Sequence, residues 1–278
     1  MLLGYNTNGL AHHDPIDAVD LLADIGYRSV AITIDHGVLS PRDDRCLEQA
    51  HRLRDALQAR GMRSVIETGA RFLLDAREKH EPTLVSADPS GRARRVEFLR
   101  HAIDMARELG ADCMSFWSGR LRDEVGAGIA LDRLAGGLRQ VIDYAADQDV
   151  MLGFEPEPGM FIDTTASFER LLQWIDAPHF CLTLDVGHLY CLHEVPIADY
   201  ITRGGERIVN VHIEDMRAGV HEHLMFGEGE MSFPPIIEAF RQIDYRGGLH
   251  VELSRHSHEG PTAARRAYEF LSPLMGEV

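Results

Sequence analysis

Residues 209–215 read VNVHIED. Valine or isoleucine occupies every second position, and the positions between them hold Asn210, His212 and Glu214. Because side chains point alternately to the two faces of a strand, one face is apolar and the other carries reactive groups. In a closed barrel the apolar face packs on the surrounding helices and the other face points to the interior. The segment therefore predicts a barrel strand with a polar inner face.

Three other runs in the second half of the chain repeat this alternation. Each carries a carboxylate at the same relative position, close to the C-terminal end of the predicted strand. That end of a parallel barrel carries the active site in enzymes with this fold. The four strands together predict one cluster of side chains, made of Glu155, Asp185, His212 and Glu252.

Eight short β-like runs alternate with helical patterns along the chain. The runs are rich in Val, Ile, Leu and Thr, and most are bounded by Gly, Pro or Asp. The predicted strands are Leu2–Thr7, Ser29–Ile34, Ser64–Gly69, Cys113–Ser118, Met151–Glu157, Cys181–Val186, Ile208–Glu214 and Gly248–Leu253. Apolar residues at helical spacing predict helices over Ile16–Ile25, Val96–Leu109, Leu131–Ala145, Pro234–Phe240 and Ala263–Leu271.

The order of these elements indicates an α/β protein. No two-residue hairpin signal joins neighbouring strands, so we expect parallel strands connected by helices. An open sheet with a nucleotide site would show a Gly-x-Gly-x-x-Gly turn after the first strand, and that turn is NTNGL, residues 6–10. The length of 278 residues suits eight strand–helix units, which need about 250. We therefore expect one domain over residues 1–278, a single (β/α)8 barrel.

Composition and charge narrow the range of partners. Asp and Glu number 44 against 28 Lys and Arg, a formal charge of -16, and an acidic surface repels nucleic acid and anionic lipid. The open, polar segment Lys79–Arg95 leads into a cluster of arginines that we expect to be a solvated face, namely Arg92, Arg94, Arg95 and Arg100. We predict no membrane span and no signal peptide. Without a Cys-x-x-Cys pair, the four cysteines are expected to be reduced thiols of a cytoplasmic protein.

The cluster of three carboxylates and one imidazole predicts a bound metal. Carboxylates packed together in a half-dry cavity repel one another, and each is expected to have a raised pKa. A divalent cation relieves this repulsion. The ligand set favours one Mn²⁺ ion, with Mg²⁺, Co²⁺ or Zn²⁺ as alternatives. The competing interpretation is a set of carboxylates paired with Arg or Lys.

Five segments carry a resemblance to a known family. They are GFEPEPG (153–159), LTLDVGH (182–188), VNVHIED (209–215), HLMFGEGEMSF (223–233) and HVELS (250–254). In this order they resemble the xylose isomerase-like TIM-barrel superfamily, which groups sugar isomerases and epimerases with apurinic endonucleases. The N-terminal half of the chain matches mainly through its rhythm of strands and helices.

The resemblance implies a role for each matching residue. Glu155, Asp185, His212 and Glu252 fall on the metal ligands, and His188 falls on a position that contacts substrate. The two glutamates are implied to serve as catalytic acid and base as well. The expected reaction is isomerisation or epimerisation of a small sugar, keto-sugar or polyol through a metal-stabilised cis-enediolate.

Five further residues are candidates for contacts with substrate. Trp117 ends a predicted strand and is either an inward ring that stacks on a sugar or an outward core residue. Glu67 either binds a sugar hydroxyl or forms a buried ion pair, and Glu157 is either a substrate contact or a solvated rim carboxylate. Arg217 either clamps a carboxylate or phosphate or lies on the surface. His223 lies on the loop that leads to the GEG sequence.

Other assignments stay open. His221 and His223 match a pair that binds additional metal ions in the endonuclease branch, although His221 stands where that branch has Asp. His51, His80 and His101 are expected on the surface.

An inosose-dehydratase-like lyase, an apurinic endonuclease and a non-catalytic ligand-binding barrel are the alternatives to the sugar enzyme. The sequence fits a homo-oligomer of barrels paired through their loops but does not require one.

Overall fold

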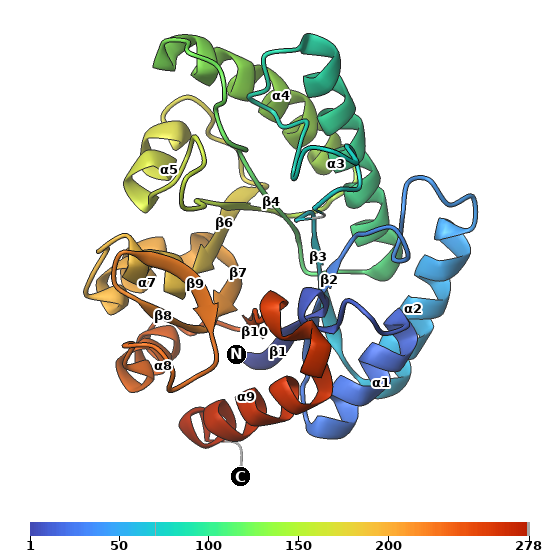
Figure 1. The fold of residues 1–278 in the computed structure, drawn as a ribbon, viewed down its shortest axis with the longest axis vertical. Coiled ribbons are helices and arrows are strands. Elements are labelled where there is room, and N and C mark those ends of the chain that lie inside the picture. The colour runs from blue at the N-terminus through green and yellow to red at the C-terminus, as the bar shows by residue number, and fades with distance from the viewer. Residues whose placement is uncertain (70, 277–278) are drawn as a thin grey trace.

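The computed structural model describes residues 1–69 and 71–276. Eight parallel strands close into a barrel in the order β1-β2-β3-β4-β5-β6-β7-β10, and β10 pairs with β1. Figure 1 shows these strands at the centre and the helices around them. The predicted single (β/α)8 barrel is therefore confirmed.

All eight predicted strands are present, several of them shorter at one or both ends. The barrel strands are β1 Leu2–Asn6, β2 Ser29–Thr33, β3 Arg63–Glu67, β4 Met114–Trp117, β5 Leu152–Glu155, β6 Phe180–Asp185, β7 Ile208–Ile213 and β10 Gly248–Val251. A carboxylate or an aromatic ring that ends a strand lies at the C-terminal rim of the barrel. This is the position of Glu67, Trp117, Glu155 and Asp185.

The five predicted helices are present, and the structure extends the list. In the described residues the α-helices are α1 Pro15–Ile25, α2 Cys46–Arg60, α3 Pro89–Leu109, α4 Ala127–Asp147, α5 Thr165–Leu172, α6 Val186–Cys191, α7 Ile197–Gly204, α8 Phe233–Gln242 and α9 Gly260–Met275. Short 3-10 helices are η1 Thr7–Leu10, η2 Gly205–Arg207 and η3 Ser254–Glu259. None of the described helices is long and apolar enough to cross a bilayer.

Helix α3 begins earlier than the apolar spacing predicts. Asp88 accepts hydrogen bonds from the backbone of Ser90 and Gly91 and caps the helix, and Pro89 occupies its first position. The polar segment Lys79–Arg95 is therefore partly helical. Arg95, expected in solvent, is buried at 4 % exposure and donates to the carbonyls of His80 and Pro82.

An antiparallel hairpin interrupts the barrel pattern after β7. It consists of β8 Asp215–Arg217 and β9 Val220–Leu224, drawn in orange in Figure 1. Its turn contains Gly219 at φ 71°, a conformation that glycine adopts without steric cost. The hairpin lies outside the eight predicted strands, and those eight strands are parallel, as expected.

The apolar core lies between strands and helices, and the barrel interior is mostly polar. Leu3, Phe154 and Val211 belong to the continuous outer core. Val209 is an exception to the predicted alternation, because it packs inside the barrel with the small cluster that contains Val65 and Cys113. A shift of register between β6 and β7 at this level lets Val209 and Asn210 both face inward.

Candidate metal centre

Four side chains from successive strands converge at the C-terminal rim. Glu155 and Asp185 end β5 and β6, His212 is the last but one residue of β7, and Glu252 directly follows β10. Asp185 pairs with His212 in the sheet register, and His212 pairs with His250. One ligand atom from each of the four residues lies within 4.8 Å of the others. The geometry matches the cluster that the sequence predicts.

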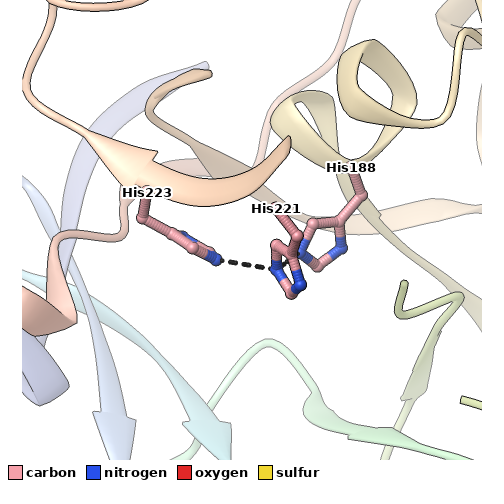
Figure 2. Close-up of side chains that lie close together, drawn as sticks. All are labelled: His188, His221 and His223. Carbon is pink, nitrogen blue, oxygen red and sulfur yellow. Dashed lines mark hydrogen bonds between the residues drawn. The ribbon is translucent and has the colours of Figure 1, made fainter. Parts of the chain in front are cut away.

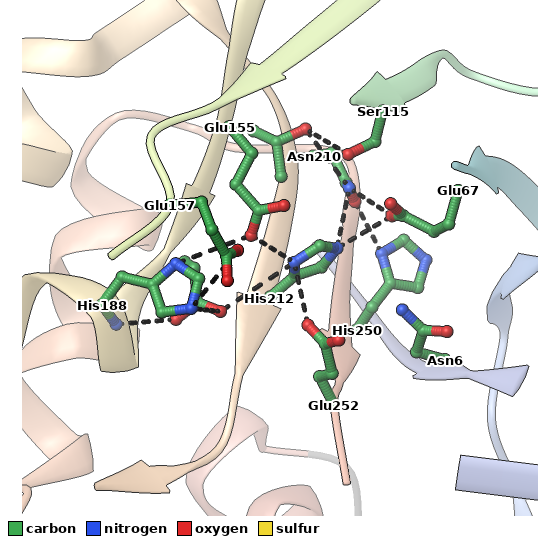
Figure 3. A network of polar contacts seen from close by, with 12 residues as sticks. Asn6, Glu67, Ser115, Glu155, Glu157, His188, Asn210, His212, His250 and Glu252 are labelled. Carbon is green, nitrogen blue, oxygen red and sulfur yellow. Dashed lines mark hydrogen bonds and ion pairs between the residues drawn. The ribbon is translucent and has the colours of Figure 1, made fainter. Parts of the chain in front are cut away.

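The imidazole of His212 is oriented from both sides (Figure 3). Its Nδ1 lies 3.0 Å from Glu155 Oε1 and 3.1 Å from Glu252 Oε2. Its Nε2 lies 2.8 Å from Glu67 Oε1. A metal-binding histidine usually donates its other ring N–H to a carboxylate. In a cluster that holds a metal, Nδ1 would therefore face the metal and the Nε2 hydrogen would point to Glu67.

The side chains of the cluster shift one another's ionisation. Burial, reinforced by Glu252 and Asp185, raises the pKa of Glu155 to about 7. Burial alone would lower the pKa of His212, but the carboxylates of Glu67, Glu155 and Glu252 raise it well above its usual value. Burial likewise opposes ionisation of Asp185, yet the surrounding histidines lower the pKa of its carboxyl. The expectation of a raised pKa for every carboxylate is therefore wrong for Asp185.

The residues fit a divalent cation. Asp185 Oδ2 is buried and has no hydrogen-bond partner among the described residues, so a polar atom faces the centre of the cluster without a donor. No Arg or Lys forms an ion pair with these four residues within the described chain. This disfavours the alternative in which the carboxylates are simply paired with Arg or Lys. Three carboxylates and one imidazole suit a cation such as Mn²⁺.

A polar network inside the barrel supports the cluster from below. His250 bridges Ser29 and Asn210 through its two ring nitrogens, each at 2.8 Å. Asn210 donates to Glu67 Oε1 at 2.8 Å, and Glu67 in turn holds His212. Buried polar networks with every member bonded fix side chains in one arrangement, so this network pre-orients the imidazole of His212.

Three histidines lie beside the four ligands (Figure 2). His188 Nε2 is 3.1 Å from His221 Nε2, and that atom is 3.2 Å from His223 Nε2. His188 comes from α6, whereas the other two come from β9 of the hairpin. The hairpin therefore brings His221 and His223 to the rim of the barrel.

A cavity of about 670 Å³ opens above the four ligands. Four of the predicted substrate contacts line it: Glu67, Trp117, Glu157 and His223. Burial, and then the charge on Glu155, raises the pKa of the Glu157 carboxyl well above its usual value. The ring of Trp117 faces inward and has Arg95 at 4.9 Å from its centroid.

Two candidates lie outside the lining of this cavity. His188 is buried and has its Nε2 3.3 Å from Asp185 Oδ2, one layer behind the ligands. Arg217 lies on β8, and its guanidinium donates to Glu228 O at 3.0 Å. The structure therefore brings His188 to the ligand cluster and leaves Arg217 on the surface.

Several lining residues have no role in the sequence-based prediction. Asn8, in η1, donates from Nδ2 to Glu252 Oε1 at 2.7 Å. His80, expected on the surface, lines the cavity and has its ring centroid 5.2 Å from that of Trp117. Asn8 follows the C-terminal end of β1, a position that marks it as a rim residue. No local pattern in the sequence predicts that His80 lines the cavity.

The fold and this cluster together define a (β/α)8 barrel with a group of carboxylates and an imidazole at its C-terminal rim that could hold a metal ion. The chain belongs to the family described as the xylose isomerase-like TIM barrel, whose model matches residues 19–274.

Known proteins similar to the chain include several sugar epimerases. It is 24% identical over 251 residues to L-ribulose-5-phosphate 3-epimerase UlaE of Escherichia coli (strain SMS-3-5 / SECEC), which covers 89% of this chain and 85% of that protein. An L-ribulose 3-epimerase structure has a TM-score of 0.80 at 20% identity, covering 99% of this chain and 94% of the other. The D-allulose 3-epimerase of Methylomonas sp. has a TM-score of 0.78 at 21% identity, covering 99% and 98%.

Proposed function

We propose that the protein is a divalent-metal-dependent epimerase of a small keto-sugar. The observation that carries the proposal is the placement of Glu155 and Glu252. Glu155 ends β5 and Glu252 directly follows β10. The barrel places β6 and β7 between these strands, and both glutamates reach Nδ1 of His212. An epimerase has to remove a proton from one face of a carbon and return one to the opposite face. Two carboxylates that approach one point from different strands meet this requirement.

The metal would be held by Glu155, Asp185, His212 and Glu252. When bound, a divalent ion acts as a Lewis acid that polarises the substrate carbonyl and acidifies the adjacent C–H bond. One glutamate then accepts that proton, and the other donates a proton to the opposite face of the same carbon.

The cavity also has features that suit a sugar. Its walls combine carboxylates and imidazoles with the inward ring of Trp117, and an indole face stacks on the apolar face of a sugar. The sugar epimerases among the similar proteins favour epimerisation over isomerisation. The proposal therefore takes a ketose or ketose phosphate as the substrate class.

Proton exchange tests the function directly. Purified protein with Mn²⁺ is incubated in D₂O with a panel of ketoses and ketose phosphates, and mass spectrometry and NMR follow deuterium uptake and epimer formation. We expect uptake and epimer formation with at least one substrate, reduced at least 10²-fold in Glu155→Gln and Glu252→Gln. Asp112→Asn, at the opposite end of the barrel, is the matched control and should keep wild-type activity.

Two results would contradict the proposal. Exchange that persists in both glutamine variants would remove the glutamates from the reaction. Absence of exchange across the whole panel, with metal bound at the site, would favour the non-catalytic ligand-binding barrel.

A further inference from the structure

The cavity above the ligand cluster has a basic end. The Lys and Arg side chains that line it are Arg71, Lys79 and Arg255. Arg255 is paired with Glu222, whose Oε1 lies 2.6 Å from its Nη1. Arg71 and Lys79 form no ion pair with a carboxylate of the described chain. A protein with a formal charge of -16 therefore keeps two unpaired cations at its candidate site.

The acidic residues nearest to Lys79 in the sequence are bound to other partners. Glu78 and Glu81 both pair with Arg122, at 2.8 and 2.9 Å. Asp75 accepts hydrogen bonds from two backbone N–H groups of its own segment. Lys79 is also the only lysine in the sequence. The segment thus occupies its carboxylates elsewhere and leaves the ammonium group of Lys79 free to bind a ligand.

A row of contacts connects this basic end to the ligand cluster. His80 N donates to Arg71 O at 2.6 Å, so the main chain of Arg71 lies beside that of His80 and of its neighbour Lys79. The ring of His80 lies 5.2 Å from that of Trp117. Trp117 in turn pairs with Glu155 in the sheet register. The cavity wall therefore runs from a metal ligand along an indole ring to two cations.

The ionisation of His80 reflects the positive charge at this end. Burial, and then the charges of Lys79 and Arg95, lower the pKa of His80 to about 4. Arg71 acts in the same direction. At pH 7 the imidazole is neutral and can still donate one hydrogen bond to an anion.

We propose that Lys79 and Arg71 bind the phosphate group of a phosphorylated ketose whose sugar end lies on the metal centre. This inference rests on the proposed function and selects one of its two substrate classes. A phosphate monoester carries a charge of about -1.5 to -2 at pH 7 and three acceptor oxygens. Two unpaired cations match this charge better than they match a neutral sugar or a single carboxylate. Arg217, the arginine that the sequence offers for this role, donates to a surface carbonyl instead.

The two side chains would contribute in different ways. The guanidinium of Arg71 can hold two phosphate oxygens at once, whereas the ammonium of Lys79 acts as a compact point charge. Because both lie at the far end of the cavity from the metal ligands, they would set substrate specificity and take no part in proton transfer.

Substrate preference tests the inference. Mn²⁺-loaded protein is assayed with L-ribulose, D-fructose and the terminal phosphate of each. We expect wild type to favour a phosphate over its free sugar by roughly 10²-fold or more in kcat/KM, and Lys79→Gln and Arg71→Gln each to lower this ratio about 10- to 100-fold. Lys79→Arg keeps the charge and should keep most of the preference. Arg77→Gln, exposed on the same segment and outside the cavity lining, is the matched control and should keep the wild-type ratio.

The single lysine also allows a test that needs no turnover. Reductive methylation with ¹³C-formaldehyde labels Lys79 and the terminal α-amine and preserves the charge of both. Inorganic phosphate, titrated into the Mg²⁺-loaded protein, should shift the Lys79 resonance in ¹³C NMR spectra saturably, and the shift should weaken in Arg71→Gln. The α-amine serves as the internal control, and chloride at equal ionic strength should leave the Lys79 resonance in place.

Several results would overturn the inference. These are equal kcat/KM for free and phosphorylated ketoses, a preference that Lys79→Gln leaves unchanged, and a preference for a keto-uronate, which would assign the cations to a carboxylate. Epimerisation of free ketoses without a phosphate preference would overturn the inference and leave the proposed function standing. A saturable shift of Lys79 without epimerisation of any sugar would contradict the proposed function and support the phosphate site, so the two failures are distinguishable.

Discussion

At the scale of single residues, the site depends on side chains that hold other side chains in position and do not contact substrate themselves. Glu67 was a candidate for binding a sugar hydroxyl, but its carboxylate accepts from Asn210 and lies 2.8 Å from His212 Nε2. A carboxylate in this position fixes the tautomer of a metal-binding imidazole and raises its basicity. Glu67 is therefore a positioning residue for His212.

Replacing Glu67 should weaken metal binding. Glu67→Gln preserves the size of the side chain but removes its charge, and loss of such a partner typically costs about 10- to 100-fold in metal affinity. Isothermal titration with Mn²⁺ measures the change. Glu78→Gln, an exposed carboxylate paired with Arg122, is the control and should match wild type. Unchanged affinity in Glu67→Gln would show that Glu67 does not support His212.

His80 predicts a dependence of stability on pH. Burial, assisted by Lys79 and Arg95, lowers the pKa of His80 from 6.5 to about 4. As pH falls below about 6.5, the unfolded chain takes up a proton at this residue before the folded chain does. The folded state therefore loses stability between about pH 6.5 and pH 4, by at most roughly 3 kcal/mol.

The variant His80→Gln, neutral at every pH, isolates this effect. Denaturant unfolding at pH 7 and pH 5 should show a smaller loss of stability in His80→Gln than in wild type. His12→Gln, on an exposed loop, is the control for removal of a histidine. Equal losses in wild type and His80→Gln would exclude His80 as a source of the acid sensitivity.

At the scale of elements, the predicted strands and helices are confirmed where the apolar pattern is strong. The same pattern does not predict the structure of the connections between them. The β8–β9 hairpin and the early start of α3 depend on Gly219 and on the Asp88 cap. The hairpin matters most, because it carries His221 and His223 to the ligands. Its position is maintained by Asp215, whose carboxylate accepts from the backbone N–H groups of Met216, Gly227, Gly229 and Met231.

Removing the Asp215 carboxylate should loosen the segment that follows the hairpin. Asp215→Ala leaves several backbone N–H groups without an acceptor, and hydrogen bonds to a charged group contribute about 1.5–3 kcal/mol each when lost singly. We expect a lower melting temperature and faster hydrogen exchange over residues 225–231, measured by mass spectrometry. Asp143→Ala, exposed on α4, should leave both unchanged. Wild-type exchange rates in Asp215→Ala would contradict the assigned role.

At the scale of the whole molecule, closure of the barrel determines which residues meet at the site, and net charge determines which partners can bind. Pairing of β1 with β10 joins the first and last strands, so Asn8 from the N-terminal region reaches Glu252 from the C-terminal region. Figure 1 shows α9 beside α1 and β1. The candidate metal centre is therefore assembled from segments near both ends of the given chain and requires closure of the barrel.

The charge of -16 predicts no useful affinity for nucleic acid. Binding to a phosphate backbone depends on Lys and Arg that displace counterions, and Arg95, one of the clustered arginines, is buried. Fluorescence anisotropy with a duplex that contains an abasic-site analogue, at 0.15 M salt with Mn²⁺, should show no saturable binding at micromolar protein. Cleavage of that duplex at the abasic site would instead support the endonuclease alternative.

The sequence by itself determined the barrel and the convergence of four side chains at its rim, because alternation along a strand and position at a strand end are local properties. The apolar neighbours along each strand must pack outward on the helices, so the residues between them point into the barrel. This applies to Glu155, Asp185, His212 and Glu252. Only the tertiary structure decided the surroundings of these ligands. Contacts such as Glu67 with His212, Asn8 with Glu252 and Glu214 with His223 join residues from separate elements. Their distances depend on strand register, on the shift beside Val209 and on where a hairpin folds, and no local pattern of residues encodes these.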